Sequence, residues 1–212
     1  MLRLTLKKKS IKENARFHKR QEILLSLDVK KFFDSITSDK VYKVFSSLGY
    51  QEDIVVMLTN LCCLNGCLPQ GAPTSPIISN IILKKFDDEV GKFTNEKKIR
   101  YTRYADDMTF SGDFNPGQII SFVKNRLYEL GLKLNEEKTR TRKKSQRQEV
   151  TGIVVNEKMQ LPKSVRRKDS SGNILYKKIW IRISYAILWY REEELSESFE
   201  RENPIWIIYK SV

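Results

Sequence analysis

Three aspartates occupy positions where a carboxylate is costly unless it has a partner or a function. Asp28 ends an apolar run that begins at Ile23, and Asp106 and Asp107 lie between two short apolar segments. A buried carboxylate loses its hydration, and only a hydrogen-bonding or charged partner can compensate for that loss. Oxygen ligands suit Mg²⁺, with Mn²⁺ as a substitute, better than they suit zinc or copper. If the carboxylates converge, they predict a site for two ions about 4 Å apart that activate a hydroxyl and neutralise a phosphate leaving group.

The same residues also have an ordinary interpretation. Aspartate is common in turns because its side chain bonds to nearby backbone amides. Under this interpretation Asp28 caps the turn after its strand, and Asp106 and Asp107 form the tip of a hairpin. The tetrapeptide Tyr104-Ala105-Asp106-Asp107 is suggestive only in combination with other motifs.

The elements that would bring the aspartates together are a strand and a hairpin. Apolar residues bounded by charge predict a buried strand at 23–29 that delivers Asp28 at its end. Short strands at 99–104 and 108–111 flank the aspartate pair and predict a tight hairpin. Helical spacing and turn residues predict the other elements: a helix from Ser38 as N-cap to Gly49, a helix at 54–64, a helix capped by Ser75 that runs to about Val90, a helix opened by Asn115-Pro116 and ended by Gly131, and a strand at 132–134.

This order of elements predicts an α+β fold. Strand, helices, hairpin, helix and strand in succession give a split βαβ arrangement, a ferredoxin-like antiparallel sheet with helices on one face. A hairpin at 150–161 that turns near Asn156-Glu157 is expected to extend this sheet. An amphipathic helix is expected at 174–190.

The charge balance favours a polyanionic partner such as nucleic acid. The chain has 39 Lys and Arg residues against 26 Asp and Glu residues, a formal net charge of +13. Basic residues gather at 138–144 and 163–168, where each neutralised phosphate would add salt-dependent affinity. A solvated basic loop is the alternative. The candidate nucleic-acid-binding residues are Arg142, Lys143, Lys144, Arg166 and Arg167.

The sequence disfavours a protein held together by disulfides or zinc and a protein that crosses a membrane. Cys62, Cys63 and Cys67 have no histidine nearby, which fits neither a disulfide framework nor a zinc site, so we expect buried reduced thiols. No uninterrupted apolar run approaches the length that crosses a bilayer, and the basic N-terminus lacks a following apolar segment. We therefore expect a cytoplasmic protein with no membrane partner.

Five segments in order resemble the motifs of the reverse transcriptase palm, over residues 14–160. They are Leu27-Asp28-Val29 with Phe32-Phe33 (motif A), Leu68-Pro69-Gln70-Gly71 (motif B), Arg103-Tyr104-Ala105-Asp106-Asp107 (motif C), Gly131-Leu132-Lys133-Leu134-Asn135 with Lys138-Thr139 (motif D) and Val150-Thr151-Gly152 (primer-grip region). The resemblance implies an RNA-directed DNA polymerase. It divides the chain into a palm with partial fingers at 1–161 and a partial thumb or helical extension at 162–212.

The resemblance assigns the metal ligands. Asp28 and Asp106 would be the principal ligands of two Mg²⁺ ions, and Asp107 would be the third carboxylate. The carbonyl of Val29 would complete the coordination shell.

The resemblance also assigns contacts to the substrate. Phe33 resembles the aromatic residue under the incoming sugar that excludes a 2′-hydroxyl, whereas Phe32 is expected to pack in the core. Gln70 and Gly71, in a proline-fixed loop, resemble the segment that contacts the incoming deoxynucleotide. Lys138 matches a lysine proposed as general acid to the pyrophosphate, with simple phosphate binding as the alternative.

Two signatures resemble those of bacterial retron enzymes within this family. Asn14-Ala15-Arg16-Phe17-His18 resembles their Asn-Ala-x-x-His signature, and Val150-Thr151-Gly152 resembles their second one. His18 has no mechanism assigned to it. The partners that the resemblance implies are a structured noncoding RNA template, the RNA–DNA hybrid, dNTPs and an effector protein, in an antiphage defence system.

Two other functions stay open. The chain could be a noncatalytic or partner-dependent RNA-binding remnant of the palm, or a polymerase of group II intron or diversity-generating type. The motif A strand begins at Ile23, which leaves no room for the basic fingers strands that precede it in this family. We therefore expect these 212 residues to polymerise weakly or not at all on their own.

Overall fold

The computed structural model describes residues 2–3 and 11–160. The elements in this part of the chain are β1 (Leu2–Arg3), α1 (Ile11–Phe17), β2 (Ile23–Asp28), α2 (Ser38–Ser46), α3 (Glu52–Cys62), α4 (Thr74–Ile82), α5 (Lys84–Glu96), β3 (Arg100–Tyr104), β4 (Asp107–Gly112), α6 (Pro116–Glu129), the 3-10 helix η1 (Glu136–Lys138), β5 (Arg140–Lys143), β6 (Glu149–Val150) and β7 (Ile153–Val154).

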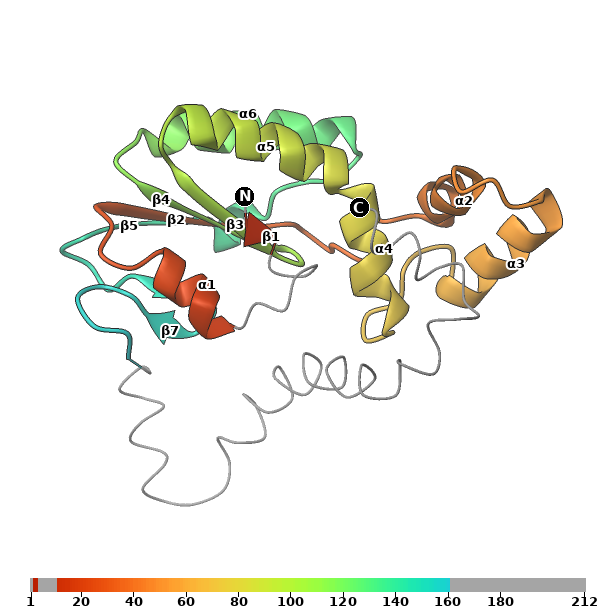
Figure 1. Ribbon diagram of the computed structural model, residues 1–212, viewed down its shortest axis with the longest axis horizontal. Coiled ribbons are helices and arrows are strands. Elements are labelled where there is room, and N and C mark those ends of the chain that lie inside the picture. Colours follow the sequence, from red (N-terminus) through yellow and green to blue (C-terminus); the bar gives the residue numbers. More distant parts are fainter. Residues whose placement is uncertain (1, 4–10, 161–212) are drawn as a thin grey trace, which may run out of the picture. The chain divides into compact units, whose positions relative to one another are not determined.

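Five of the described strands form one sheet in the order β1-β3-β4-β2-β5. β1 is parallel to β3, and the other neighbouring pairs are antiparallel. Figure 1 shows α5 and α6 side by side over one face of this sheet and α1 on the opposite face. The predicted mixture of helices with an antiparallel sheet is confirmed, but helices lie on both faces rather than on one.

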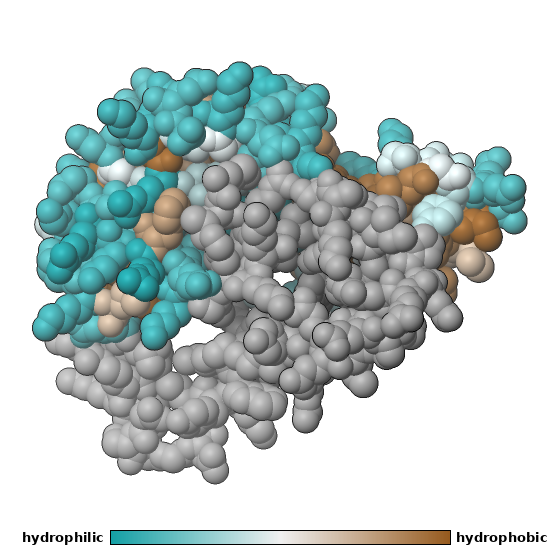
Figure 2. Space-filling view, viewed as in Figure 1, coloured by the Kyte–Doolittle hydropathy of each residue, from teal (hydrophilic) through white to brown (hydrophobic). Residues whose placement is uncertain are grey.

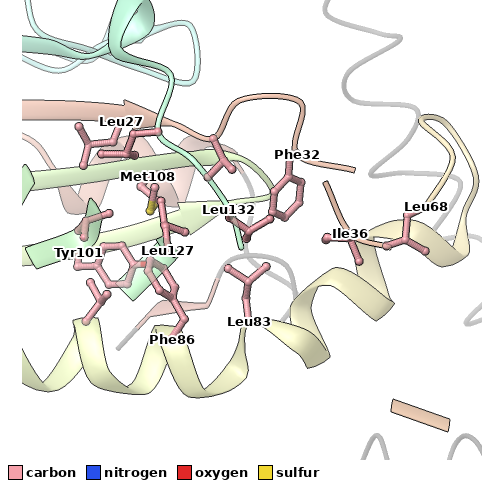
Figure 3. Close-up of a cluster of buried hydrophobic side chains, with 14 of the residues drawn as sticks. Leu27, Phe32, Ile36, Leu68, Leu83, Phe86, Tyr101, Met108, Leu127 and Leu132 are labelled. Atoms are coloured by element: carbon pink, nitrogen blue, oxygen red, sulfur yellow. The ribbon is translucent and has the colours of Figure 1, made fainter. Parts of the chain in front are cut away.

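The alternation of side chains along β2 explains the two faces. Leu25 and Leu27 face one side of the sheet, and Leu24 and Asp28 face the other. Leu25 and Leu27 belong to the main hydrophobic cluster, together with Phe86 of α5 (Figure 3). Leu24 belongs to a smaller cluster on the α1 side. Asp28 therefore lies at the end of a well-anchored strand, on the face away from the main core.

One predicted helix is two helices. A single helix capped by Ser75 and continuing to Val90 was expected, but α4 and α5 are separated at Leu83. Leu83 has φ −85° and ψ 6°, and its side chain is completely buried. Core packing thus bends the chain at a residue type that gives no local signal for a break. Pro73, not Ser75, precedes the first turn of α4.

Two expectations about the edge of the sheet need correction. The segment 132–134 forms no regular strand and pairs only through a bridge between Leu134 and Val29. The basic run after it, for which no strand was expected, contains β5, which pairs with β2. All four β5 side chains are exposed, so no hydrophobic alternation marked this strand.

The hairpin after β5 stands apart from the main sheet. β6 and β7 pair across Thr151-Gly152 and form a separate two-stranded sheet. A bridge between Val154 and Gln160 closes a second turn around the predicted Asn156-Glu157. The predicted turn is therefore present, but the expected extension of the main sheet is wrong.

The ends of two other helices largely follow their predicted signals. Asn115 caps α6, because its side chain accepts a hydrogen bond from the amide of Gly117 (2.9 Å). Gly131 and Gly49 have positive φ after α6 and α2, respectively. Thr37, rather than the predicted Ser38, is the N-cap of α2.

The three cysteines are free thiols, but only Cys62 is buried, whereas Cys63 and Cys67 are partly exposed.

α3 exposes Val56, Met57 and Leu61. Figure 2 shows hydrophobic surface at the end of the molecule where α2 and α3 lie. Of the helices described, none has the length and apolar character needed to span a membrane.

Several predictions concern residues outside the described ranges. These are the C-terminal unit at 162–212, the helix at 174–190, and the basic candidates Arg166 and Arg167.

Candidate active site

The three aspartates lie at the same end of neighbouring strands. β2 and β4 pair in a register that sets Asp28 directly opposite Asp107. Asp106 is in the tight turn between β3 and β4, and its carbonyl accepts a hydrogen bond from the amide of Val29 (3.2 Å). The fold therefore brings Asp28, Val29, Asp106 and Asp107 together from segments far apart in the sequence.

Asp28 is the most enclosed of the three aspartates, with 6% of its surface exposed. Its Oδ2 accepts a hydrogen bond from Nζ of Lys138 (3.0 Å), and its Oδ1 accepts one from Nδ2 of Asn135 (3.2 Å). The amide of Asn135 also donates to the Asp28 carbonyl (2.8 Å). Asn135 had no predicted role, because its sequence position does not show that the segment after α6 returns to β2.

Lys138 places a cation at this acidic site. Its hydrogen bond to Asp28, followed by the charges of Asp28, Asp106 and Asp107, raises the pKa of the Lys138 ammonium. The Lys138 side chain is 62% exposed, so solvent screens the ion pair. Lys138 is therefore protonated beside the aspartates and can leave Asp28 at little cost.

The chemistry of this donor set fits a hard divalent cation. Three clustered carboxylates repel one another unless a cation balances them, and carboxylate oxygen is the ligand that Mg²⁺ prefers. Within the described residues, no group of three His, Cys, Asp or Glu side chains surrounds a ready metal position. Both oxygens of Asp28 are bonded to Lys138 and Asn135. Metal binding here would therefore require Lys138 to move away from Asp28.

A family model described as reverse transcriptase (RNA-dependent DNA polymerase) matches residues 2–155. The chain belongs to the reverse transcriptase family. It is 37% identical to the retron Ec86 reverse transcriptase of Escherichia coli over 153 residues, which cover 71% of this chain and 48% of that protein. It is 33% identical to the retron Mx65 reverse transcriptase of Myxococcus xanthus over 178 residues, 74% of this chain and 42% of that protein. The chain thus spans about half the length of these relatives.

A solved structure of apo telomerase from Candida tropicalis, truncated from its C-terminal domain, has a similar fold. The TM-score is 0.52 at 13% sequence identity, and the match covers 68% of this chain and 36% of that one. At this identity the likeness concerns the fold alone.

Two neighbouring aromatic residues after β2 have different surroundings. Phe32 is buried in the main core, as expected, whereas Phe33 is partly exposed, with the ring centroids 5.0 Å apart. The Phe33 carbonyl accepts a hydrogen bond from the Ile36 amide (3.0 Å), and the Ile36 carbonyl accepts one from the Leu68 amide (3.0 Å). The segment after β2 and the start of the 68–71 loop are thus tied together.

Gln70 and Gly71 are exposed in a loop that is held at both ends. Leu68 is bonded to Ile36, and the carbonyl of Pro69 accepts a hydrogen bond from Oγ of Ser75 (2.8 Å). Gly71 has φ +96°, a conformation that L side chains rarely adopt. Hydrogen bonds, in addition to Pro69, Pro73 and Pro76, therefore hold the backbone that presents Gln70.

The pairing of β5 with β2 divides the predicted basic residues between two faces. Arg142 lies opposite Leu24 and therefore shares the face of Asp28, whereas Lys143 lies on the other face. Lys144 follows the strand and forms an ion pair with Glu22 (2.8 Å). Arg140, which was not a candidate, also lies on the Asp28 face, opposite Ser26. The basic side chains of β5 thus alternate between the two faces of the sheet. Only the strand pairing reveals this alternation, because the basic run is continuous in sequence.

His18 lies in a buried hydrogen-bond network between α1 and the sheet. The hydroxyl of Thr102 donates to Oδ1 of Asn14 (2.8 Å), so it accepts from Nε2 of His18 (2.8 Å). Nδ1 of His18 then accepts from the Ser111 hydroxyl (2.7 Å). Burial, and next the charge of Arg100, lower the pKa of His18 to about 3. The neutral imidazole thus attaches α1 to β3 and β4.

The two retron-like signatures contact each other. Ala15 of α1 and Val150 of β6 are fully buried in the same small cluster, with Leu24 and Val155. Asn14 of α1 and His18, which directly follows α1, are hydrogen-bonded within the network that reaches the sheet. The two signatures therefore build one structural unit on the Asp28 face of the sheet, at the end away from the aspartates.

Proposed function

We propose that this protein is a retron-type RNA-directed DNA polymerase that copies a structured noncoding RNA into DNA by two-metal nucleotidyl transfer. The observation that carries the proposal is the register that sets Asp28 against Asp107, with Asp106 in the adjoining turn. Family membership supports the reaction, and the retron relatives support the class. The DNA product would serve antiphage defence together with the RNA and an effector protein.

The carboxylates would hold the metal ions of a palm site. Asp28 and Asp106 would be the principal ligands, Asp107 the third carboxylate, and the Val29 carbonyl a further donor. When bound, two Mg²⁺ or Mn²⁺ ions would activate the primer 3′-hydroxyl and neutralise the leaving pyrophosphate. Lys138, once released from Asp28, would remain nearby as a protonated group for the pyrophosphate.

Residues around the aspartates would select and orient the substrate. The partly exposed ring of Phe33 would exclude a 2′-hydroxyl on the incoming nucleotide, while the buried Phe32 supports it. Gln70, exposed in its hydrogen-bonded loop, would contact the incoming dNTP at little entropic cost. Arg140 and Arg142 would bind backbone phosphates of the RNA–DNA hybrid on the face of Asp28.

The main rival is a noncatalytic RNA-binding remnant, and the two proposals predict different results in primer extension. The purified protein is given an RNA template with an annealed DNA primer, dNTPs and Mg²⁺. Asp106→Asn removes one anionic ligand without changing side-chain volume, and Asp113→Asn is the control, because Asp113 is an exposed acid just beyond β4. RNA affinity is measured for the same proteins.

We expect weak extension, in keeping with the low activity expected from the sequence, that needs RNA and Mg²⁺ and that is lost in Asp106→Asn but not in Asp113→Asn, with RNA affinity unchanged. RNA binding by wild-type protein without extension and without Mn²⁺ binding would favour the remnant. Equal extension by Asp106→Asn would refute the site. An adjacent inverted-repeat RNA locus would favour the retron class over the intron class.

A further inference from the structure

A buried ion pair lies directly behind the turn that carries Asp106 and Asp107. Arg103 of β3 is 5% exposed, and Asp87 of α5 is 1% exposed. The Arg103 guanidinium donates from Nε to Oδ1 of Asp87 (2.9 Å) and from Nη2 to Oδ2. Its third nitrogen, Nη1, donates to the carbonyl of Ala105 (3.0 Å). One side chain thus links α5 to the hairpin turn.

The turn needs support because Ala105 has a left-handed backbone conformation. Its φ is 51°, which is disfavoured for a residue that has a Cβ atom. The next residue is Asp106, whose carbonyl is bonded to the amide of Val29. Relaxation of Ala105 would rotate the following peptide and move Asp106 and Asp107 relative to β2.

Stability alone is a poor explanation for this network. Burial of two charges costs hydration that their attraction often fails to recover, so an apolar pair would stabilise the fold as well. Burial lowers the pKa of Arg103, but the hydrogen bonds and charge of Asp87 outweigh it and raise the pKa overall, so Arg103 stays charged. The Tyr101 hydroxyl also donates to Oδ1 of Asp87 (2.9 Å), so this oxygen accepts hydrogen bonds from both Tyr101 and Arg103.

We propose that Asp87 and Arg103 are positioning residues that hold the turn at Ala105, and through it Asp106 and Asp107, in the geometry required for metal binding. This inference deepens the proposed function and rests on it. Arg103 belongs to motif C but had no predicted role, and Asp87 lies 16 residues earlier in the chain, on α5.

Two single substitutions remove different arms of the network. Arg103→Lys keeps a positive charge opposite Asp87 but cannot hold both Asp87 and the Ala105 carbonyl, because an ammonium lacks the planar fork of a guanidinium. Tyr101→Phe removes the Tyr101–Asp87 hydrogen bond and leaves the Arg103–Ala105 bond in place. Each variant loses a buried hydrogen bond, so each should lower the melting temperature. Only Arg103→Lys should disturb the turn.

Three readouts separate positioning from stability. We expect Arg103→Lys to speed amide hydrogen exchange at 105–107, and to weaken Mn²⁺ binding measured by electron paramagnetic resonance. It should also lower kcat by about 10- to 100-fold, with a smaller change in the KM for dNTP. Tyr101→Phe should leave all three within about two-fold of wild type, because the turn keeps its hydrogen bond. Ala105→Gly should restore part of the loss in the Arg103→Lys background, since glycine adopts this φ without strain.

A second variant covers the case in which Arg103→Lys does not fold. The double substitution Asp87→Leu with Arg103→Met replaces the charges by apolar groups of similar volume, so it should fold and still show the faster exchange and weaker Mn²⁺ binding. Variants of Arg103 that match Tyr101→Phe in all readouts would overturn the inference, and so would a failure of Ala105→Gly to restore activity. Normal Mn²⁺ binding and polymerisation by Asp106→Asn would instead refute the proposed function itself.

Discussion

The polar side chains at the two ends of one face of the sheet differ in burial and in hydrogen bonding. At the closed end (Asn14, His18, Thr102 and Ser111), the side chains are buried under α1 and bond to one another around a neutral imidazole. At the open end (Asp28, Asp106, Asp107 and Lys138), three acids from the same group of strands lie near a largely exposed lysine that is paired with Asp28.

The strands β2, β3 and β4 thus carry residues that stabilise the fold at one end and candidate catalytic residues at the other. The closed end has its hydrogen bonds satisfied internally, so it can anchor α1 but offers little to a ligand. The open end gathers three carboxylates beside an exposed lysine that can move, which is what a metal-dependent site needs. Substitutions at the two ends should therefore change different measured quantities.

The largest effect is expected from Asp28→Asn. Loss of a carboxylate ligand should lower the rate of RNA-templated synthesis by about 1,000-fold or more, because metal ions contribute several kcal/mol to transition-state stabilisation. The free energy of unfolding should fall by no more than about 1 kcal/mol, because solvent screens the lost ion pair with Lys138 and repulsion with Asp107 is relieved. Primer extension and urea unfolding on the same preparation check both parts. A marked loss of stability would place Asp28 with the structural residues instead.

A smaller effect is expected from Phe33→Ala at the rim of the open end. Removal of the ring should reduce discrimination against ribonucleotides by about 10- to 100-fold, because the clash with the 2′-hydroxyl disappears. The measurement is the ratio of kcat/KM values for dNTP and rNTP. Unchanged discrimination would move the steric gate to another residue.

At the closed end, the buried His18 should make the free energy of unfolding depend on pH. The folded pKa of His18 is about 3 and its ordinary value is 6.5, so between these values the unfolded state binds the extra proton. The contribution of neutral His18 is complete above pH 6.5 and declines as the pH falls toward 3. Relative to His18→Gln, wild type should lose about 2 to 3 kcal/mol of unfolding free energy between pH 7 and pH 4.5. Urea unfolding of both proteins at pH 7 and pH 4.5 measures this change. The same difference in unfolding free energy between the two proteins at both pH values would contradict the buried neutral imidazole.

The smallest effect concerns the basic strand at the edge of the open face. Arg140→Gln with Arg142→Gln should reduce the slope of log affinity against log salt for RNA–DNA hybrid by up to about two units, one for each phosphate that the variant no longer neutralises. Lys143→Gln is the matched control, because Lys143 lies on the other face of the same strand. Salt titrations of hybrid binding measure the slopes. Equal slopes for Lys143→Gln and the double variant would show that the two faces of β5 do not differ in hybrid binding.

Local patterns in the sequence predicted the elements that have regular periods. The apolar run of β2, the hairpin at Asp106-Asp107 and the Asn115 cap of α6 each have a strong local cause, and each is present. The break at Leu83 and the strand β5 have none, because core packing bends the first and backbone pairing alone creates the second. Asn135 and Asp87 were missed as site residues for a related reason: their roles depend on contacts 107 and 16 residues away.

If Asp28, Asp106 and Asp107 form a divalent metal site, the purified protein should bind Mn²⁺ through these carboxylates. Electron paramagnetic resonance measures free Mn²⁺ in titrations of wild type, Asp106→Asn and Asp113→Asn without any need for polymerisation. We expect Asp106→Asn to weaken binding by about 10-fold or more, because one anionic ligand of a hard cation is removed, while Asp113→Asn matches wild type. Equal Mn²⁺ affinity in all three proteins would contradict the metal site.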